Sequence, residues 1–164
     1  MNRPLVIAHR GASGERPENT ASAFERAIEL DADMIETDLH VSRDGVIVIH
    51  HDASLERFGD PGEIRDRSAS ELAALNAAPG GSAPERMPTL LDLLEGFGSR
   101  MDFNLELKVG LNAPYDGLEE RVFAEVEARG LLPRMLFSSF DDGVLARLRA
   151  VSSAARIAVL VSPR

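Results

Sequence analysis

The sequence predicts an α/β fold built around a parallel β-sheet. Short apolar runs of strand length alternate along the chain with longer segments in which apolar residues recur at a helical period. Strands that alternate with helices form right-handed βαβ units, which place successive strands parallel. The chain has 164 residues, of which 44% are hydrophobic, and this is the size of one domain with a core of its own.

Six apolar runs are expected to form the strands, because they are short and bounded by polar or turn-forming residues. They cover residues 5–8, 34–39, 46–49, 103–107, 135–137 and 157–161. Helices are expected between them. Thr20 is expected to cap a helix whose buried side includes Phe24 and Ala27, and Thr89 to cap a helix rich in leucine. Apolar residues at helical spacing indicate two more helices, around Leu118, Val122 and Val126 and around Leu145 and Leu148.

Residues 59–88 form the least regular stretch, which is rich in Gly, Pro, Ser and Ala. One short helical piece is expected at residues 69–75. We interpret the stretch as a short insertion or loop after the third strand, within a single domain over residues 1–164, and not as a linker between domains.

Composition excludes several classes of function. There is no cysteine, so disulfides, thiolate zinc sites and cysteine nucleophiles are excluded. The net charge of −9 argues against a nucleic-acid or anionic membrane partner. The apolar runs are too short for membrane insertion, and the four apolar residues after Pro4 are too few for a signal peptide, so a cytoplasmic location is expected. Of the 18 basic residues, only Lys108 is a lysine.

Carboxylates interrupt two of the predicted strands. Glu36, Asp38 and His40 share one face of a strand, and Glu106 and Lys108 share one face of another. Both faces of a helix-covered parallel sheet are normally apolar, so these carboxylates need a compensating cation. Three carboxylates at strand ends suit Mg²⁺ or Ca²⁺. The competing interpretation is an exposed strand edge, or a simple ion pair between Glu106 and Lys108.

Histidines at strand ends suggest acid–base chemistry. His9 ends the first strand, and His50 and His51 end the third. Two such imidazoles can act as general base and general acid, since imidazole titrates near neutral pH. Strand alternation favours His51 over His50 only if Ile47 and Ile49 face the site, so that choice stays open. His40 is expected to be a rim residue.

The cations complete a site for phosphoryl chemistry. Arg10 and Lys108 are expected to contact a phosphoryl group, while a metal ion offsets the surplus of carboxylates. The sequence has no Walker-type glycine-rich loop, which disfavours nucleotide hydrolysis. A sugar-phosphate isomerase with a similar barrel would use carboxylate bases, but it does not explain two histidines at strand ends.

These segments resemble the glycerophosphodiester phosphodiesterase family. The resemblance is carried, between residue 5 and about residue 161, by AHRGASGERPENT, MIETDLHVSRDGVIVIHHDASLERF, MPTLLDLLE, FNLELKV and LFSSFD. It implies a (β/α)₈ TIM barrel of the phosphatidylinositol-phosphodiesterase type, with the site at the carboxyl ends of the strands. The residues that match the family pattern are His9 and His51 as catalytic histidines, Glu36, Asp38 and Glu106 as metal ligands, and Arg10 and Lys108 as phosphate contacts.

The resemblance also implies a reaction and a structural shortfall. The reaction is hydrolysis of a glycerophosphodiester to glycerol 3-phosphate and an alcohol, with attack by the glycerol 2-hydroxyl or by water. Residues 59–88 correspond to the insertion of the family, in the short form of bacterial cytoplasmic members. About six strand and helix units are found where a barrel needs eight, so we expect the last two units to be missing.

The expected shortfall leaves two possibilities for this chain. The first is an active, metal-dependent phosphodiesterase, since the whole proposed site lies within residues 9–108. The second is a catalytically inactive truncated barrel that retains a metal and phosphate site. In either case, open strand edges favour self-association.

Overall fold

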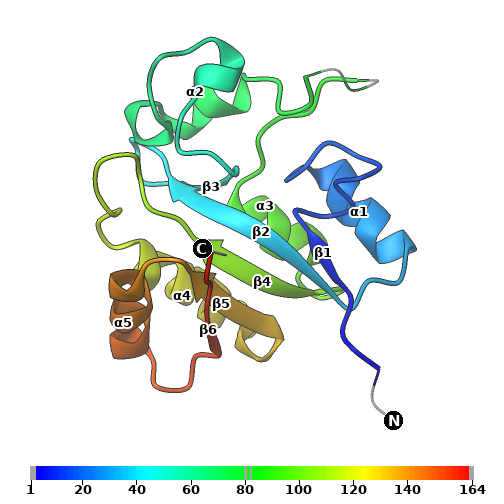
Figure 1. Cartoon of the computed structure of the whole chain (residues 1–164), viewed down its shortest axis with the longest axis vertical. Helices are drawn as coiled ribbons and strands as arrows, with labels where there is room; N and C mark the ends of the chain where they lie inside the picture. The colour runs from blue at the N-terminus through cyan, green and yellow to red at the C-terminus, as the bar shows by residue number, and fades with distance from the viewer. Residues whose placement is uncertain (1–2, 80, 82, 163–164) are drawn as a thin grey trace.

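The structure is a computed structural model that describes residues 3–79, 81 and 83–162. Residues 1–2, on which part of the signal-peptide argument rests, and residues 80 and 82 of the expected insertion lie outside this description, as do residues 163–164. The chain forms one curled sheet with helices packed against its outer face (Figure 1).

The elements follow the predicted alternation. The strands are β1 (Ile7–His9), β2 (Met34–Val41), β3 (Ile47–Ile49), β4 (Asp102–Leu107), β5 (Met135–Ser139) and β6 (Ile157–Val159). The α-helices are α1 (Ala21–Glu29), α2 (Ala69–Ala73), α3 (Leu90–Phe97), α4 (Leu118–Ala128) and α5 (Asp142–Val151). Short 3₁₀ turns are η1 (Glu56–Phe58), η2 (Ile64–Asp66) and η3 (Leu132–Arg134).

The sheet confirms the α/β class with a parallel core, and it corrects one strand. Five strands run parallel in the order β1-β2-β4-β5-β6. β3 instead pairs antiparallel with β2, with Leu39 opposite Ile49, so the expectation of a parallel third strand is wrong. The connection from β2 to β3 is too short for a parallel crossover, which needs a dozen or more residues. Gly45, at φ 83°, closes the hairpin turn.

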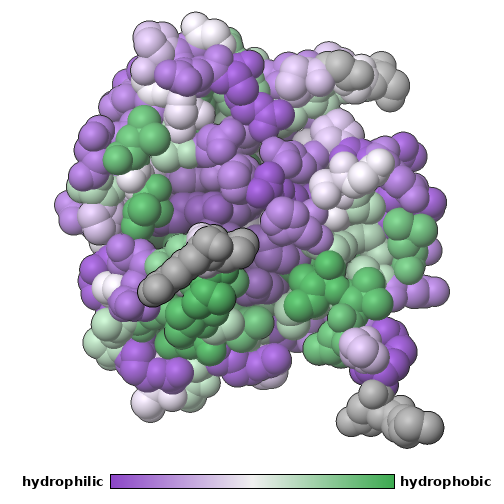
Figure 2. Space-filling view, viewed as in Figure 1, coloured by the Kyte–Doolittle hydropathy of each residue, from purple (hydrophilic) through white to green (hydrophobic). Residues whose placement is uncertain are grey.

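Alternation along the strands gives the sheet two different faces. On β2, Ile35 and Leu39 belong to the main hydrophobic core, which packs beneath the helices. The intervening residues Glu36 and Asp38 face the concave side, which Figure 2 shows as a purple hollow between green patches. One face of each central strand therefore stabilises the fold, while the other is available for a site.

Local signals fixed the helix starts as expected. The Thr20 hydroxyl accepts from the Ala23 amide at the start of α1, and the Thr89 hydroxyl accepts from the Asp92 amide at the start of α3. α2 confirms the short helical piece. It packs with Leu55 and Ile64 in a small second hydrophobic cluster above the sheet. The bounds of the expected insertion, residues 59–88, stay a prediction. None of the helices that the structure describes has the length and apolarity to cross a membrane.

Candidate active site

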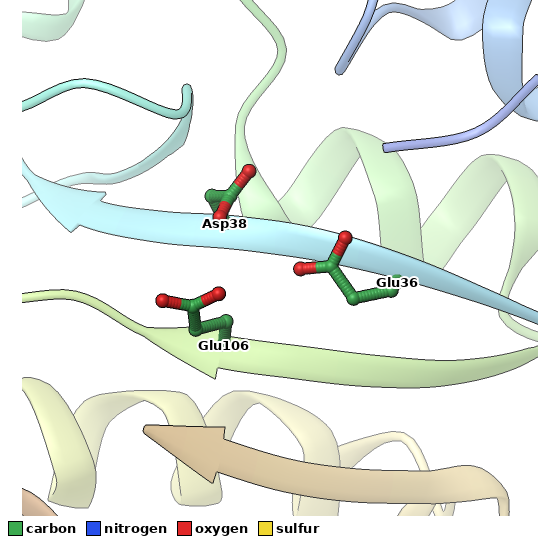
Figure 3. A group of neighbouring side chains, drawn as sticks. All are labelled: Glu36, Asp38 and Glu106. Carbon is green, nitrogen blue, oxygen red and sulfur yellow. The ribbon is translucent and has the colours of Figure 1, made fainter. Parts of the chain in front are cut away.

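Three carboxylates meet on the concave side of the sheet. Glu36 and Asp38 come from β2 and Glu106 from β4, and the register places Asp38 directly opposite Glu106 (Figure 3). One oxygen of each lies within 4.8 Å of the others. The three residues are only 7%, 1% and 6% exposed, so the interpretation as an exposed strand edge is wrong.

The cluster carries more negative charge than its neighbours neutralise. Burial, together with the charge of Asp38, raises the pKa of Glu36 to about 8. Although burial opposes ionisation of Asp38, Lys108 and a hydrogen bond from Asn19 hold the pKa of Asp38 below its usual value. Lys108 Nζ lies 2.9 Å from Asp38 and 2.7 Å from Glu106, which is the ion pair that the competing interpretation expected.

That ion pair does not satisfy the cluster. Glu36 Oε1 is buried and has no hydrogen-bond partner among the described residues. A buried carboxylate oxygen without a donor is costly unless a cation lies next to it. Three oxygen donors around one point are the ligand set that Mg²⁺ and Ca²⁺ prefer, so these residues fit a hard divalent ion.

β1 brings His9 and Arg10 to the edge of the cluster. His9 Nε2 lies 3.7 Å from Glu36 Oε2, and its side chain is largely exposed. Burial of part of the ring and the charge of Arg10 lower the pKa of His9, which favours the neutral, proton-accepting form. The Arg10 guanidinium donates to Glu18 at 2.8 Å, and its Nε lies 3.5 Å from Asp38. Arg10 has a positive φ of 58°, which turns the chain back over the carboxyl end of the strand.

The two adjacent histidines point to different surroundings. His51 lines a cavity with Glu106 and Lys108, and its Nδ1 lies 2.8 Å from the Asp52 carboxylate. His50 is buried beside Phe58, with ring centroids 5.3 Å apart, and burial lowers the pKa of His50 to about 4. The geometry brings His51 to the cluster.

Strand alternation does not explain this placement. Ile47 and Ile49 belong to the main core beneath the helices, so the condition on which alternation favoured His51 is not met. The chain bends after β3, and the hairpin returns it toward the carboxylates: the His50 amide donates to the Asp38 carbonyl at 3.1 Å.

His40 is not a rim residue, which corrects the expectation. It is 1% exposed, and burial lowers its pKa to about 3. Its ring nitrogens lie 2.8 Å from the Tyr115 hydroxyl and 3.2 Å from the His51 carbonyl oxygen. Tyr115 comes from the segment after β4, which covers His40; no local sequence pattern reveals that coverage.

Sequence reasoning also missed two polar residues that hold the cluster. Asn19 donates its amide hydrogen to Asp38 at 2.8 Å and accepts from the Thr37 hydroxyl at 2.7 Å. Glu18 binds Arg10 with one oxygen and Arg57 with the other. Both residues lie in the segment RPENT, which contributes to the family resemblance but in which helix capping by Thr20 was the only role predicted for a single residue.

Similar proteins were found by sequence and by structure. Residues 9–164 match the model of the "Glycerophosphoryl diester phosphodiesterase family". A glycerophosphodiester phosphodiesterase of Caldanaerobacter subterraneus subsp. tengcongensis is 36% identical over 96% of this chain and 67% of its own length. One from Bacillus altitudinis is 35% identical over 94% of this chain and 65% of its own.

Solved structures agree with these matches. A glycerophosphoryl diester phosphodiesterase structure from Agrobacterium tumefaciens superimposes with a TM-score of 0.89 at 28% identity, over 99% of this chain and 66% of that one. A phosphodiesterase from Oleispira antarctica, solved with the product sn-glycerol-3-phosphate, gives a TM-score of 0.77 at 35% identity, over 97% and 66%. The chain thus spans about two thirds of the length of these relatives.

Proposed function

Since this chain belongs to the glycerophosphoryl diester phosphodiesterase family, we propose that it hydrolyses glycerophosphodiesters to glycerol 3-phosphate and an alcohol. The observation that carries the proposal is the buried group of Glu36, Asp38 and Glu106, with a histidine on each side of it. The product named in the Oleispira antarctica structure, sn-glycerol-3-phosphate, is the product that this reaction would give.

In the proposed mechanism, Glu36, Asp38 and Glu106 would hold Mg²⁺ or Ca²⁺. When bound, the ion supplies positive charge that polarises a phosphoryl oxygen and offsets the buried carboxylates. Arg10 and Lys108 donate hydrogen bonds to the remaining phosphoryl oxygens and stabilise the charge that develops in the transition state. Lys108 can do so because burial, which opposes its charge, is outweighed by Asp38 and Glu106, and its pKa is raised.

The two histidines divide the proton transfers. The lowered pKa of His9 suits it to remove the proton from the attacking hydroxyl, either the glycerol 2-hydroxyl or water. Attack by water gives glycerol 3-phosphate directly, whereas attack by the 2-hydroxyl gives a cyclic glycerol phosphate that water must then open. His51 is held at Nδ1 by Asp52, which leaves Nε2 to protonate the departing alcohol as its P–O bond breaks. Hydrogen bonding from His51 holds the pKa of Asp52 low although burial opposes it, so Asp52 stays ionised and orients the ring.

Activity and its metal dependence test the proposal together. With glycerophosphocholine and Mg²⁺ or Ca²⁺, we expect release of glycerol 3-phosphate, measured with a coupled dehydrogenase. EDTA is expected to abolish the release and added metal to restore it, because without the ion the buried carboxylates repel the phosphate. Equal rates with and without EDTA would contradict the metal site. No release by a folded, metal-loaded protein would contradict the activity.

The second candidate function is a metal and phosphate site without activity on a partial barrel, and it is suggested by the open edges of the described sheet. Among the described residues, β1 pairs only with β2 and β6 only with β5. The exposed apolar residues beside these edges are Leu5, Val6, Ile7, Val159 and Val161. We propose that these edges pair with those of a second copy, since free edges with apolar neighbours are templates for association.

Light scattering after size-exclusion chromatography checks the association. We expect a concentration-dependent mass above the 17.8 kDa of one chain. Placing lysine at Val6 and Val159 is expected to restore the monomer, because charged edge residues block strand pairing. A monomer at every concentration would contradict the association.

The cytoplasmic location and the absence of nucleic-acid partners stay predictions from the sequence.

A further inference from the structure

Two buried side chains outside the proposed catalytic set, Tyr115 and His40, form a chain of hydrogen bonds that reaches the backbone of His51. His40 Nε2 lies 3.2 Å from the His51 carbonyl oxygen, and His40 Nδ1 lies 2.8 Å from the Tyr115 hydroxyl. A carbonyl can only accept, so Nε2 carries the hydrogen and donates it. In the neutral ring, Nδ1 therefore accepts from the Tyr115 O–H. Tyr115 is the only tyrosine of the chain and is 6% exposed.

Side chains of residues 63–65 hold the segment that carries Tyr115 in place. The Arg65 guanidinium lies 4.5 Å from the centre of the Tyr115 ring and donates to the Ala113 carbonyl at 2.5 Å. Glu63 accepts from the Leu111 amide at 2.9 Å. A side chain at Gly110 would overlap the Arg65 guanidinium, so a larger residue there would displace Arg65 from this position. These contacts fix the Tyr115 hydroxyl over His40.

His51 needs an anchor of this kind. It follows β3 and lies outside the strand ladder, and its ring is bound by Asp52, which belongs to the same bend. Asp52 can orient the ring within that bend, but it does not connect the bend to β2. The His50 amide holds the start of the bend to the Asp38 carbonyl. His40, which lies on β2 with Glu36 and Asp38, holds the carbonyl of His51 itself.

We propose that His40 and Tyr115 are positioning residues that fix the His51 backbone relative to the carboxylates of β2. Tyr115 sets which ring nitrogen of His40 carries the hydrogen, and His40 then holds the His51 carbonyl. Both side chains are almost fully buried, so we assign them no direct role in the reaction. The inference rests on the proposed function of His51, and it predicts that the two residues affect the rate of the chemical step more than substrate binding.

Tyr115→Phe removes only the hydroxyl and is the first test. We expect kcat for glycerophosphocholine to fall about three- to tenfold with KM nearly unchanged, which corresponds to one lost hydrogen bond. ¹⁵N NMR of the imidazoles is expected to show hydrogen on Nε2 of His40 in the natural chain. In Tyr115→Phe we expect a mixture of the two tautomers and shifted signals from His51.

Ser42→Ala is the matched control, since it also removes a buried hydroxyl. That hydroxyl oxygen lies 2.7 Å from the Asp44 carboxylate and 3.0 Å from the Val46 carbonyl oxygen, and it donates its one hydrogen within the β2–β3 turn. We expect Ser42→Ala to lower stability while leaving kcat and the His51 signals as they are. The same loss of kcat in both variants would overturn the proposal, because the loss in Tyr115→Phe would then follow from lower stability of the fold and not from the position of His51.

A second pair of variants tests the bond to the His51 carbonyl. His40→Gln keeps an N–H donor near the position of Nε2, whereas His40→Leu does not. We expect the Gln variant to retain several-fold more kcat than the Leu variant. Equal kcat values, or hydrogen on Nδ1 of His40 in the natural chain, would overturn the proposal. If the natural chain releases no glycerol 3-phosphate, the proposed function fails, while the NMR signals still decide whether Tyr115 sets His40 and His51.

Discussion

His51→Ala is expected to lower kcat for glycerophosphodiester hydrolysis by about 10²- to 10⁴-fold, the usual contribution of a general acid or base. The imidazole lies at the cavity with Glu106 and Lys108, and Asp52 leaves its Nε2 available for proton transfer. A departing alkoxide is a poor leaving group, so the step that lacks a proton donor becomes rate-limiting. Initial rates at saturating metal measure the loss, and His9→Ala is expected to lose a similar amount.

His50→Asn provides the control, because His50 is the adjacent residue and faces away from the cavity. Its ring contacts Phe58, so its replacement is expected to change stability and to leave kcat within a few-fold of the natural value. Addition of imidazole is expected to restore part of the activity of His51→Ala and none of that lost in His50→Asn. Activity that survives both His9→Ala and His51→Ala would contradict the assignment of the histidines.

Glu36→Gln is expected to stabilise the metal-free protein and to abolish its response to metal. The carboxyl of Glu36 has a pKa of about 8 in the folded protein against an ordinary 4.5. It therefore binds a proton more tightly when folded, and the folded state loses stability as pH rises from 4.5 through about 8. At pH 7 the free energy of unfolding is lower than at acidic pH by on the order of 3 kcal/mol. Glutamine carries no charge and avoids this loss, and its side-chain oxygen can still accept from the Arg10 amide.

Urea unfolding with and without Ca²⁺ or Mg²⁺ measures both effects. The natural chain is expected to gain about 2.7 kcal/mol at a metal concentration one hundred times Kd, whereas Glu36→Gln gains little. Glu119→Gln is the matched control: Glu119 is as buried, but it pairs with Arg147 at 2.8 Å on the outer helices. It is expected to lose stability and to keep the metal response. A metal-free Glu36→Gln protein that is less stable than the natural chain would contradict the charge surplus.

The sequence predicted the carboxylate cluster well, because strand alternation is a local property. Glu36, Asp38 and Glu106 each follow the two-residue period of a single strand, so their shared face could be read before their strands were paired. The direction of β3 was predicted wrongly although its signal was present. The turn of a few residues before it permits a hairpin and excludes a parallel crossover.

The surroundings of His40 could not be predicted. Its burial depends on Tyr115, which lies far along the chain and reaches His40 only because Glu63 and Arg65 hold the segment after β4. Contacts of this kind depend on tertiary packing and leave no period or motif in the sequence. The structure therefore adds most where segments distant in sequence meet.

The β2–β3 hairpin sets the distances between Glu36, Asp38 and His51 without any contribution from the closure of a barrel. Glu36, Asp38 and His51 belong to one strand and its return, whose register is fixed by the pairing of Leu39 with Ile49. Changes on the opposite side of the sheet leave that register intact. If two residues were added to the turn or removed from it and the pairing shifted with them, His51 would move along β2 by one two-residue repeat of the strand. The length of this short turn is therefore constrained by the position that His51 needs for the reaction.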